Sequence, residues 1–150
     1  MKTLLSLSAA ALALGLATAA SAEERIPATA LPPTHIVHKL VGDGVDLRGL
    51  EYERGAYEAR VRTTDGKLIK MAVDPLSGDF TDSRSRVRDD AGPAPRLSAS
   101  DAVMAVAATG HWDVSEIEYR GGAWMVRASD DKGASARFAV DDTSGQLASR

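Results

Sequence analysis

The second half of this 150-residue chain repeats the first half at a fixed spacing. Residues 47–80 align without a gap with residues 114–147, at an offset of 67. Three stretches show the correspondence: Leu50-Glu51-Tyr52 with Ile117-Glu118-Tyr119, Gly55-Ala56-Tyr57 with Gly122-Ala123-Trp124, and Asp74 to Gly78 with Asp141 to Gly145. Upstream the offset falls to 66, which aligns Leu31 with Leu97. One small unit, used twice, must therefore account for both the core and the function.

The first 22 residues have the features of a secretory signal peptide. Lys2 supplies the positive start, residues 4–16 form an apolar run, and Ala20-Ser21-Ala22 is a small-x-small cleavage site. The apolar run is shorter than the roughly 20 residues that a membrane span needs. We therefore expect residues 1–22 to be cleaved and the product to be periplasmic or secreted, with no stable membrane anchor.

The composition excludes several classes of function. The chain has no cysteine, which excludes disulfides, thiol catalysis and thiolate metal sites. The full chain has 18 basic and 21 acidic residues; loss of Lys2 with the signal leaves 17 basic residues and a net charge of −4 with neutral histidines. Nucleic-acid binding needs a basic face, so this acidity argues against a nucleic-acid partner.

The mature chain divides into two modules. Module one spans residues 31–83 and module two spans residues 97–150, with a charged, Gly- and Pro-containing linker at residues 84–96. A core built from roughly 50 residues is marginal on its own. We therefore expect the two modules to pack against each other.

Each module begins with a predicted helix. In module one, Ile36, Val37 and Leu40 recur at helical spacing. In module two, Ser98 and Asp101 form a capping-box variant, with a carboxylate three residues after the cap.

Predicted strands follow each helix. In module one, Tyr57, Ala59 and Val61 alternate with charged residues, which is typical of an antiparallel sheet with one buried face. The turns carry glycine and aspartate, for which we expect structural roles: Gly55, Asp74, Gly78, Gly122, Asp141 and Gly145. The predicted fold is α+β, with two tandem repeats, each of one helix packed on a three- to four-stranded antiparallel sheet.

This order of helix, strands and turns, closed by Val-Asp-x-x-x-Gly, resembles the PepSY domain family. The carrying residues are Tyr57 to Val61, Asp65-Gly66-Lys67 and Val73 to Asp79 in module one, and Leu97 to Ala102, Trp124 to Arg127 and Val140 to Gln146 in module two. Module two departs from the pattern at two turn positions. Asp142 stands where a proline is more typical, and Lys132 lengthens the polar part of the hairpin. The resemblance implies a module of secreted, periplasmic and membrane-associated bacterial proteins, including metallopeptidase propeptides, with a proposed role in binding or restraining peptidases. It supplies no catalytic residues.

His35 and His38 lie three residues apart on the first predicted helix, so both side chains are able to face one ligand. A metal would need further ligands, and Asp43 and Asp46 lie within a few residues. In the other interpretation, His35 is a polar first-turn residue and His38 is a solvated neighbour of the apolar stripe. A periplasmic metal- or small-ligand-binding protein that uses His35 and His38 is the alternative hypothesis for function.

Two pairs of aromatic residues occupy equivalent positions in the modules. Tyr57 and Trp124 belong to the buried faces of the predicted strands and are expected core anchors. Tyr52 and Tyr119 precede the two Gly turns, where each side chain either completes the core or contacts a partner at the end of the sheet.

The sequence offers no catalytic motif. A Gly-x-Ser-x-Gly nucleophile turn is missing, and the glycines form no phosphate cradle. We therefore predict a binding protein without enzymatic activity or a cofactor, whose partner is a protein or peptide, such as a peptidase or another envelope protein. An exposed strand edge would give an extended peptide a place to add.

Overall fold

A computed structural model describes residues 25–88 and 91–149; the predicted signal peptide lies outside this part. In each half of the chain a helix is followed by four strands. The elements are α1 (Pro33–Gly42), β1 (Leu47–Glu53), β2 (Ala56–Arg62), β3 (Leu68–Val73), β4 (Phe80–Arg88), α2 (Ala99–Ala107), β5 (Asp113–Arg120), β6 (Ala123–Ser129), β7 (Ser135–Asp141) and β8 (Leu147–Ser149).

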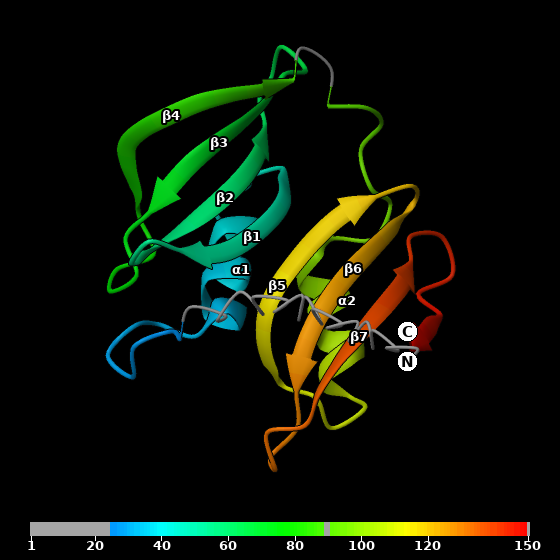
Figure 1. Cartoon of the computed structure of the whole chain (residues 1–150). Helices are drawn as coiled ribbons and strands as arrows, with labels where there is room; N and C mark the ends of the chain where they lie inside the picture. The colour runs from blue at the N-terminus through cyan, green and yellow to red at the C-terminus, as the bar shows by residue number, and fades with distance from the viewer. Residues whose placement is uncertain (1–24, 89–90, 150) are drawn as a thin grey trace, which may run out of the picture.

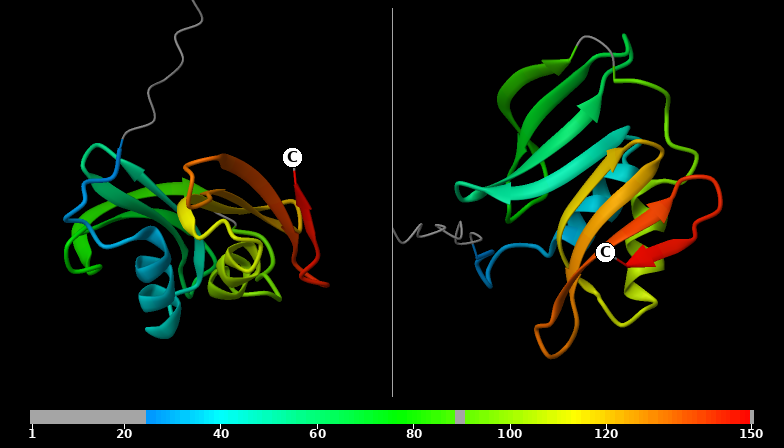
Figure 2. Two further views of the ribbon diagram at one scale, coloured as in Figure 1. Left: turned by 90° about the horizontal axis from the view of Figure 1, so that it is seen from below. Right: turned by 45° about the vertical axis from the view of Figure 1, so that its right-hand side comes forward.

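All described strands belong to one eight-stranded antiparallel sheet in the order β4-β3-β2-β1-β5-β6-β7-β8 (Figure 1). Both helices lie on the same face of the sheet, and no described helix covers the opposite face, here named the open face (Figure 2). The α+β prediction with antiparallel strands is confirmed. The two halves do not form separate sheets, because β1 and β5 pair and make the sheet continuous.

The pairing between β1 and β5, the central seam of the sheet, is symmetric. Only three residue pairs form: Gly49 with Glu118, Leu50 with Ile117, and Glu51 with Glu116. Leu50 faces Ile117, which is its equivalent at the offset of 67. In the other two pairs, Gly49 faces the equivalent of Glu51, and Glu51 faces the equivalent of Gly49. Gly49 permits this approach, because a Cβ there would lie 3.1 Å from the carbonyl oxygen of Ile117.

A β-bulge precedes the seam on both strands at equivalent positions. In β1 the register shifts between Leu47 and Gly49, and in β5 it shifts between Val114 and Glu116. The extra residues are Arg48 and Ser115, which are also equivalent at the offset of 67. Bulges redirect side chains, so each of these residues points where a regular strand would not place it.

The core lies between the helices and the sheet. The apolar stripe of α1, Ile36, Val37 and Leu40, is almost completely buried, as are Tyr57 of β2 and Trp124 of β6. Ser98 caps α2 by accepting the backbone N–H of Asp101 at 3.1 Å, as the capping pattern predicts.

The two large aromatics make the same contact in both halves. Tyr57 donates its hydroxyl to the carbonyl of Leu31 at 2.6 Å, and Trp124 donates its indole N–H to the carbonyl of Leu97 at 2.8 Å. Each bond ties the segment before a helix to the middle of its half of the sheet, and each satisfies a polar group on a buried aromatic.

The turn residues lie where the strands reverse. Gly55, Gly78, Gly122 and Gly145 have φ values between +68° and +81°, a region that favours glycine. The Asp74 carboxylate accepts the N–H groups of Leu76 and Ser77 at 2.8 and 2.9 Å. Asp141 accepts those of Thr143 and Ser144 at 3.0 and 2.8 Å, and these hydrogen bonds hold the pKa of both carboxyls below the usual range.

Strand β4 is longer than the sequence pattern suggests. Residues 84–88, the first part of the predicted linker, pair with β3 between Leu68 and Met71. Alternating charged residues are typical of a solvated linker, but they also suit an edge strand, where charge discourages unwanted pairing. Residues 89–90 lie outside the described part, and residues 91–96 form the connection to α2.

Candidate binding groove at the central seam

The strands β1 and β5 separate on either side of their three pairs, so the seam has two ends. The end that contains Asp46, Arg48 and Tyr119 is here named the closed end. The end that contains Tyr52, Asp113 and Ser115 is named the open end. Asp46, Arg48 and Tyr119 correspond to Asp113, Ser115 and Tyr52 at the offset of 67, so the two ends are built from equivalent positions.

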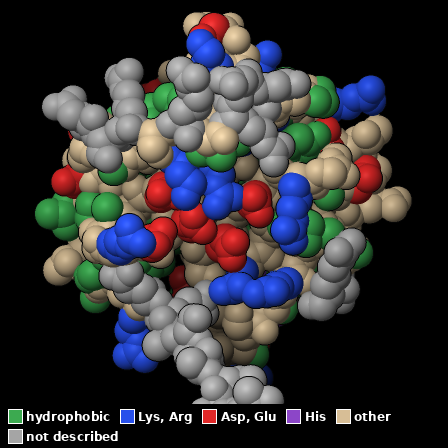
Figure 3. Space-filling model, turned by 45° about the horizontal axis from the view of Figure 1, so that its top comes forward, with side chains coloured by type: hydrophobic (Ala, Val, Ile, Leu, Met, Phe, Trp, Pro, Cys, Tyr) green, Lys and Arg blue, Asp and Glu red, His purple; other side chains and the backbone are tan. Residues whose placement is uncertain are grey.

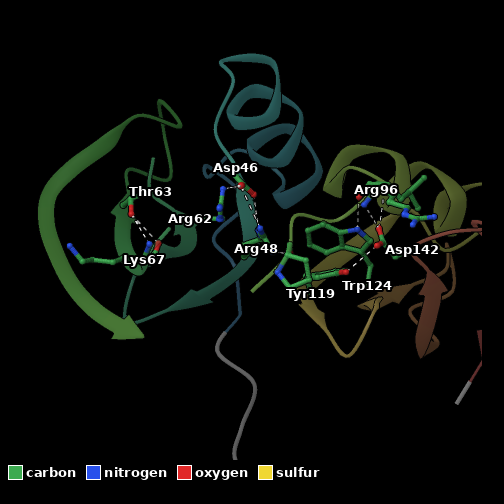
Figure 4. A network of polar contacts seen from close by, with 11 residues as sticks. Asp46, Arg48, Arg62, Thr63, Lys67, Arg96, Tyr119, Trp124 and Asp142 are labelled. Carbon is green, nitrogen blue, oxygen red and sulfur yellow. Dashed lines mark hydrogen bonds and ion pairs between the residues drawn. The ribbon is translucent and has the colours of Figure 1, made fainter. Parts of the chain in front are cut away.

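Arg48 fills the closed end (Figure 4). Its side chain is 4 % exposed, and its guanidinium lies 5.6 Å from the centre of the Tyr119 ring. Nε donates to Asp46 at 2.7 Å, and Nη1 donates to the carbonyl of Pro93 at 2.8 Å. Arg62 also approaches Asp46, at 3.6 Å. A buried guanidinium needs such partners, and here the bulge of β1 brings the side chain to them.

Asp142 completes the closed end. It is 9 % exposed and accepts the backbone N–H groups of Arg96 and Leu97 at 2.7 and 2.8 Å. The Tyr119 hydroxyl also donates to Asp142, at 3.0 Å. Burial, and then this hydrogen bond, raise the pKa of Tyr119. The carboxylate thus fastens the connection before α2 to the seam.

The open end is a groove with a volume of about 910 Å³, here named the seam groove. One wall is the segment 25–33, which leads into α1, and the other wall is formed by the ends of β1 and β5. Its polar lining consists of Glu51, Tyr52, Glu53, Asp113, Ser115 and Glu116, with Arg25 and Arg127. Four carboxylates therefore face two guanidinium groups, and the groove is acidic.

Three of the four carboxylates are already engaged, including Glu53, which Arg54 approaches at 3.4 Å. Arg60 contacts Glu51 at 3.1 Å, and Arg127 contacts Glu116 at 3.5 Å. Burial is the main cause that raises the pKa of Glu51, with a contribution from the neighbouring Glu58. Asp113 has no ion pair within residues 25–88 and 91–149, so it is the carboxylate best placed to receive a cation from outside.

The open face of the sheet carries rows of ion pairs beside this groove (Figure 3). Arg60 bridges Glu51 and Glu118 across the seam, and Lys70 pairs with Glu58. These partly exposed pairs contribute little to stability individually. They do fix the side chains of β1, β2 and β5 that border the groove.

Tyr52 and Tyr119, predicted as equivalent contact residues, lie at opposite ends of the seam. Tyr52 packs on Tyr57, and Tyr119 packs on Trp124, each with ring centres 5.1 Å apart. Tyr119 is committed to Arg48 and Asp142, whereas Tyr52 lines the seam groove. The two tyrosines are therefore similar in packing but different in accessibility to a ligand.

His35 and His38 are both exposed on α1, and His38 hydrogen-bonds to Ser100 of α2 through Nδ1. The suggested further ligands are used elsewhere, since Asp43 pairs with Lys39 at 2.9 Å and Asp46 pairs with Arg48. Among the described residues, neither histidine joins a group of three potential metal ligands.

The described residues bring together one set of three potential ligands, Glu51, Glu53 and Glu58. These carboxylates come from β1 and β2, and two of them line the groove or its rim. Sequence reasoning did not single out this set, because facing positions on neighbouring strands are not visible as a spacing in the chain.

Sequence reasoning also missed Arg48, Asp113 and Asp142. Comparison of the two halves points to two of them, since Arg48 corresponds to Ser115 and Asp142 corresponds to Pro75; Asp113 matches an identical residue, Asp46, and has no such signal. Asp142 was visible as a departure from the family pattern, but a turn position gave no reason to expect a buried carboxylate.

None of the described helices is both long and apolar enough to cross a bilayer. No curated protein matches the sequence. Among solved structures, a "putative lipoprotein" from Clostridium difficile 630 is similar, with 13 % identity, a TM-score of 0.43, and coverage of 83 % of this chain and 96 % of that one. The PepSY_2 family, described as the peptidase propeptide and YPEB domain, matches residues 4–84, more than half of the sequence. The chain therefore belongs to the PepSY family.

Proposed function

We propose that this protein is an exported binding protein of the bacterial envelope, without enzymatic activity, that holds a peptide segment of a partner in the seam groove. The partner class that the family description favours is a peptidase, whose activity the protein would restrain. The observation that carries the proposal is the groove itself: a large, acidic, aromatic-lined space beside the open face of the sheet.

The size and lining of the groove suit a peptide better than a small metabolite. Its volume of about 910 Å³ lies at the upper end of the range for small-ligand pockets. The lining mixes carboxylates with Tyr52 and the prolines of the lead-in segment, Pro27, Pro32 and Pro33. Such a surface offers both hydrogen-bond acceptors and apolar contact to an extended chain.

We also propose that the two halves are tandem PepSY-like modules at residues 31–83 and 97–150. The family match covers the first of these regions only. Support for the second comes from the shared element order, the equivalent bulges at Arg48 and Ser115, and the equivalent hydrogen bonds of Tyr57 and Trp124.

The test is inhibition of peptidases in an envelope extract of the source bacterium. Purified residues 23–150 are added to the extract, and casein cleavage is measured together with the peptidases that co-purify with the chain. We expect dose-dependent inhibition and capture of a peptidase, both weakened by Tyr52→Ala and unchanged by Met104→Ala, which alters an exposed residue on α2. Unchanged cleavage at every dose, with no peptidase captured, would refute the proposed function.

A further inference from the structure

The closed end of the seam is an internal example of how this fold binds a guanidinium group. There, Arg48 lies over the ring of Tyr119 and donates to Asp46, in a position that is almost fully buried. A second cation, Arg62, approaches the same carboxylate. The protein thus holds an arginine between an aromatic ring and an aspartate at one end of β1 and β5.

The open end keeps the acceptors of this arrangement but not its cations. Tyr52 and Asp113 correspond to Tyr119 and Asp46. Arg48, however, corresponds to Ser115, and Arg62 corresponds to Ser129. Ser115 occupies the equivalent bulge, and Ser129 pairs with Asp113 across β5 and β6. The positions that supply positive charge at the closed end therefore supply only small hydroxyl groups at the open end.

We propose that the open end of the seam groove receives an arginine side chain from an extended segment of the partner protein, stacked on Tyr52 and paired with Asp113. This inference rests on the proposed function and names the side chain that the groove selects. The partner's guanidinium would take the place that Arg48 takes at the other end.

Arginine fits this site better than lysine. A planar guanidinium stacks on an aromatic ring and donates through several N–H groups at once, whereas an ammonium group is a compact and strongly hydrated point charge. Asp113, which has no ion pair among the described residues, and the excess of carboxylates in the lining attract a cation of either kind. The stacking on Tyr52 is the interaction that favours arginine over lysine.

The first experiment places the arginine in the chain itself. Ser115→Arg supplies the side chain that the open end lacks, and it is compared with Thr64→Arg, which adds the same charge on the exposed β2–β3 hairpin. Both variants are titrated with the peptide acetyl-Ala-Ala-Arg-Ala-Ala-amide and followed by ¹H–¹⁵N NMR. For the natural chain we expect shifts at Tyr52, Asp113 and Ser115, with a dissociation constant on the order of 1 mM, as for a single anchoring side chain.

The expected result is loss of binding in Ser115→Arg and unchanged binding in Thr64→Arg. Asp113→Asn, a milder change that removes only charge, is expected to weaken binding about tenfold. Asp131→Asn, at an exposed turn, serves as its control and is expected to have no effect. Unchanged peptide binding in both Ser115→Arg and Asp113→Asn would overturn the proposal.

Peptides that replace arginine with lysine or with uncharged citrulline test the selectivity. We expect the lysine peptide to bind several-fold more weakly than the arginine peptide, and the citrulline peptide not to bind. Equal binding of all three peptides, or shifts confined to residues away from the groove, would overturn the arginine proposal. If peptidase restraint persists in Ser115→Arg, the arginine proposal fails while the proposed function stands.

Discussion

Replacement of Asp142 by alanine should destabilise the protein more than its position in a turn suggests. The carboxylate accepts two backbone N–H groups and the Tyr119 hydroxyl, and it is 9 % exposed. A hydrogen bond to a charged acceptor contributes about 1.5–3 kcal/mol. Because Arg96 is exposed, water can replace its bond. The two bonds from Leu97 and Tyr119 then give an expected loss of about 3–6 kcal/mol.

Urea and thermal unfolding of residues 23–150, followed by circular dichroism, measure this loss. A decrease of this size corresponds to a fall in melting temperature of about 10–20 °C for a domain of this length. Asp141→Ala is the matched control, since it removes the neighbouring carboxylate, whose bonds lie in an exposed turn. We expect a clearly smaller loss there. Equal losses at the two positions would refute the assignment of Asp142 as the buried fastening of the closed end.

Two further predictions concern the seam and a hairpin. Gly49→Ala should lower the free energy of unfolding by about 1–3 kcal/mol, because the added Cβ meets the Ile117 carbonyl oxygen at 3.1 Å and β5 must shift. Gly42→Ala, in open space at the end of α1, should instead raise the free energy of unfolding by roughly 0.5–1 kcal/mol. Urea unfolding of the two variants measures both changes. An unchanged free energy of unfolding in Gly49→Ala would contradict the close approach of the two strands at the seam. Hydrogen bonds from Lys67 and Thr63 lower the pKa of Asp65 to about 2. Its stabilising contribution is therefore present above the unfolded pKa near 4 and is lost as the pH falls toward 2. The melting temperature of Asp65→Asn should depend less on pH between 4 and 2 than that of the natural chain, and identical slopes would count against this assignment.

The local structure followed closely from the sequence. Period-two alternation identified the strands that contain the buried Tyr57 and Trp124 and the strands that follow them, and the capping residues Ser98 and Asp101 placed the start of α2. These features depend on neighbours within a few residues, which is why a single sequence reveals them.

The marginal size of each half predicted that the two halves contact each other, but their joining through β1 and β5 did not follow from the sequence. In the sheet order, β1 is the last strand of its own half, and such a strand has the same residue pattern whether its edge faces water or another strand, so its pairing with β5 left no local mark. The candidate site could not be predicted for the same reason, because it lies at one end of this pairing. The open end has Ser115 where the closed end has Arg48, and the importance of this difference becomes visible only once the symmetric seam is known.

Site-specific photo-crosslinking tests most directly whether the open end of the seam is where a partner binds. Benzoylphenylalanine is placed at Tyr52, inside the groove, or at Met104, on the exposed face of α2, in cells of the source bacterium. We predict a crosslinked partner from position 52 that disappears when Ser115→Arg is added, and no such product from position 104. Crosslinking from position 104 alone, or a product at position 52 that Ser115→Arg leaves unchanged, would contradict the seam groove as the binding site.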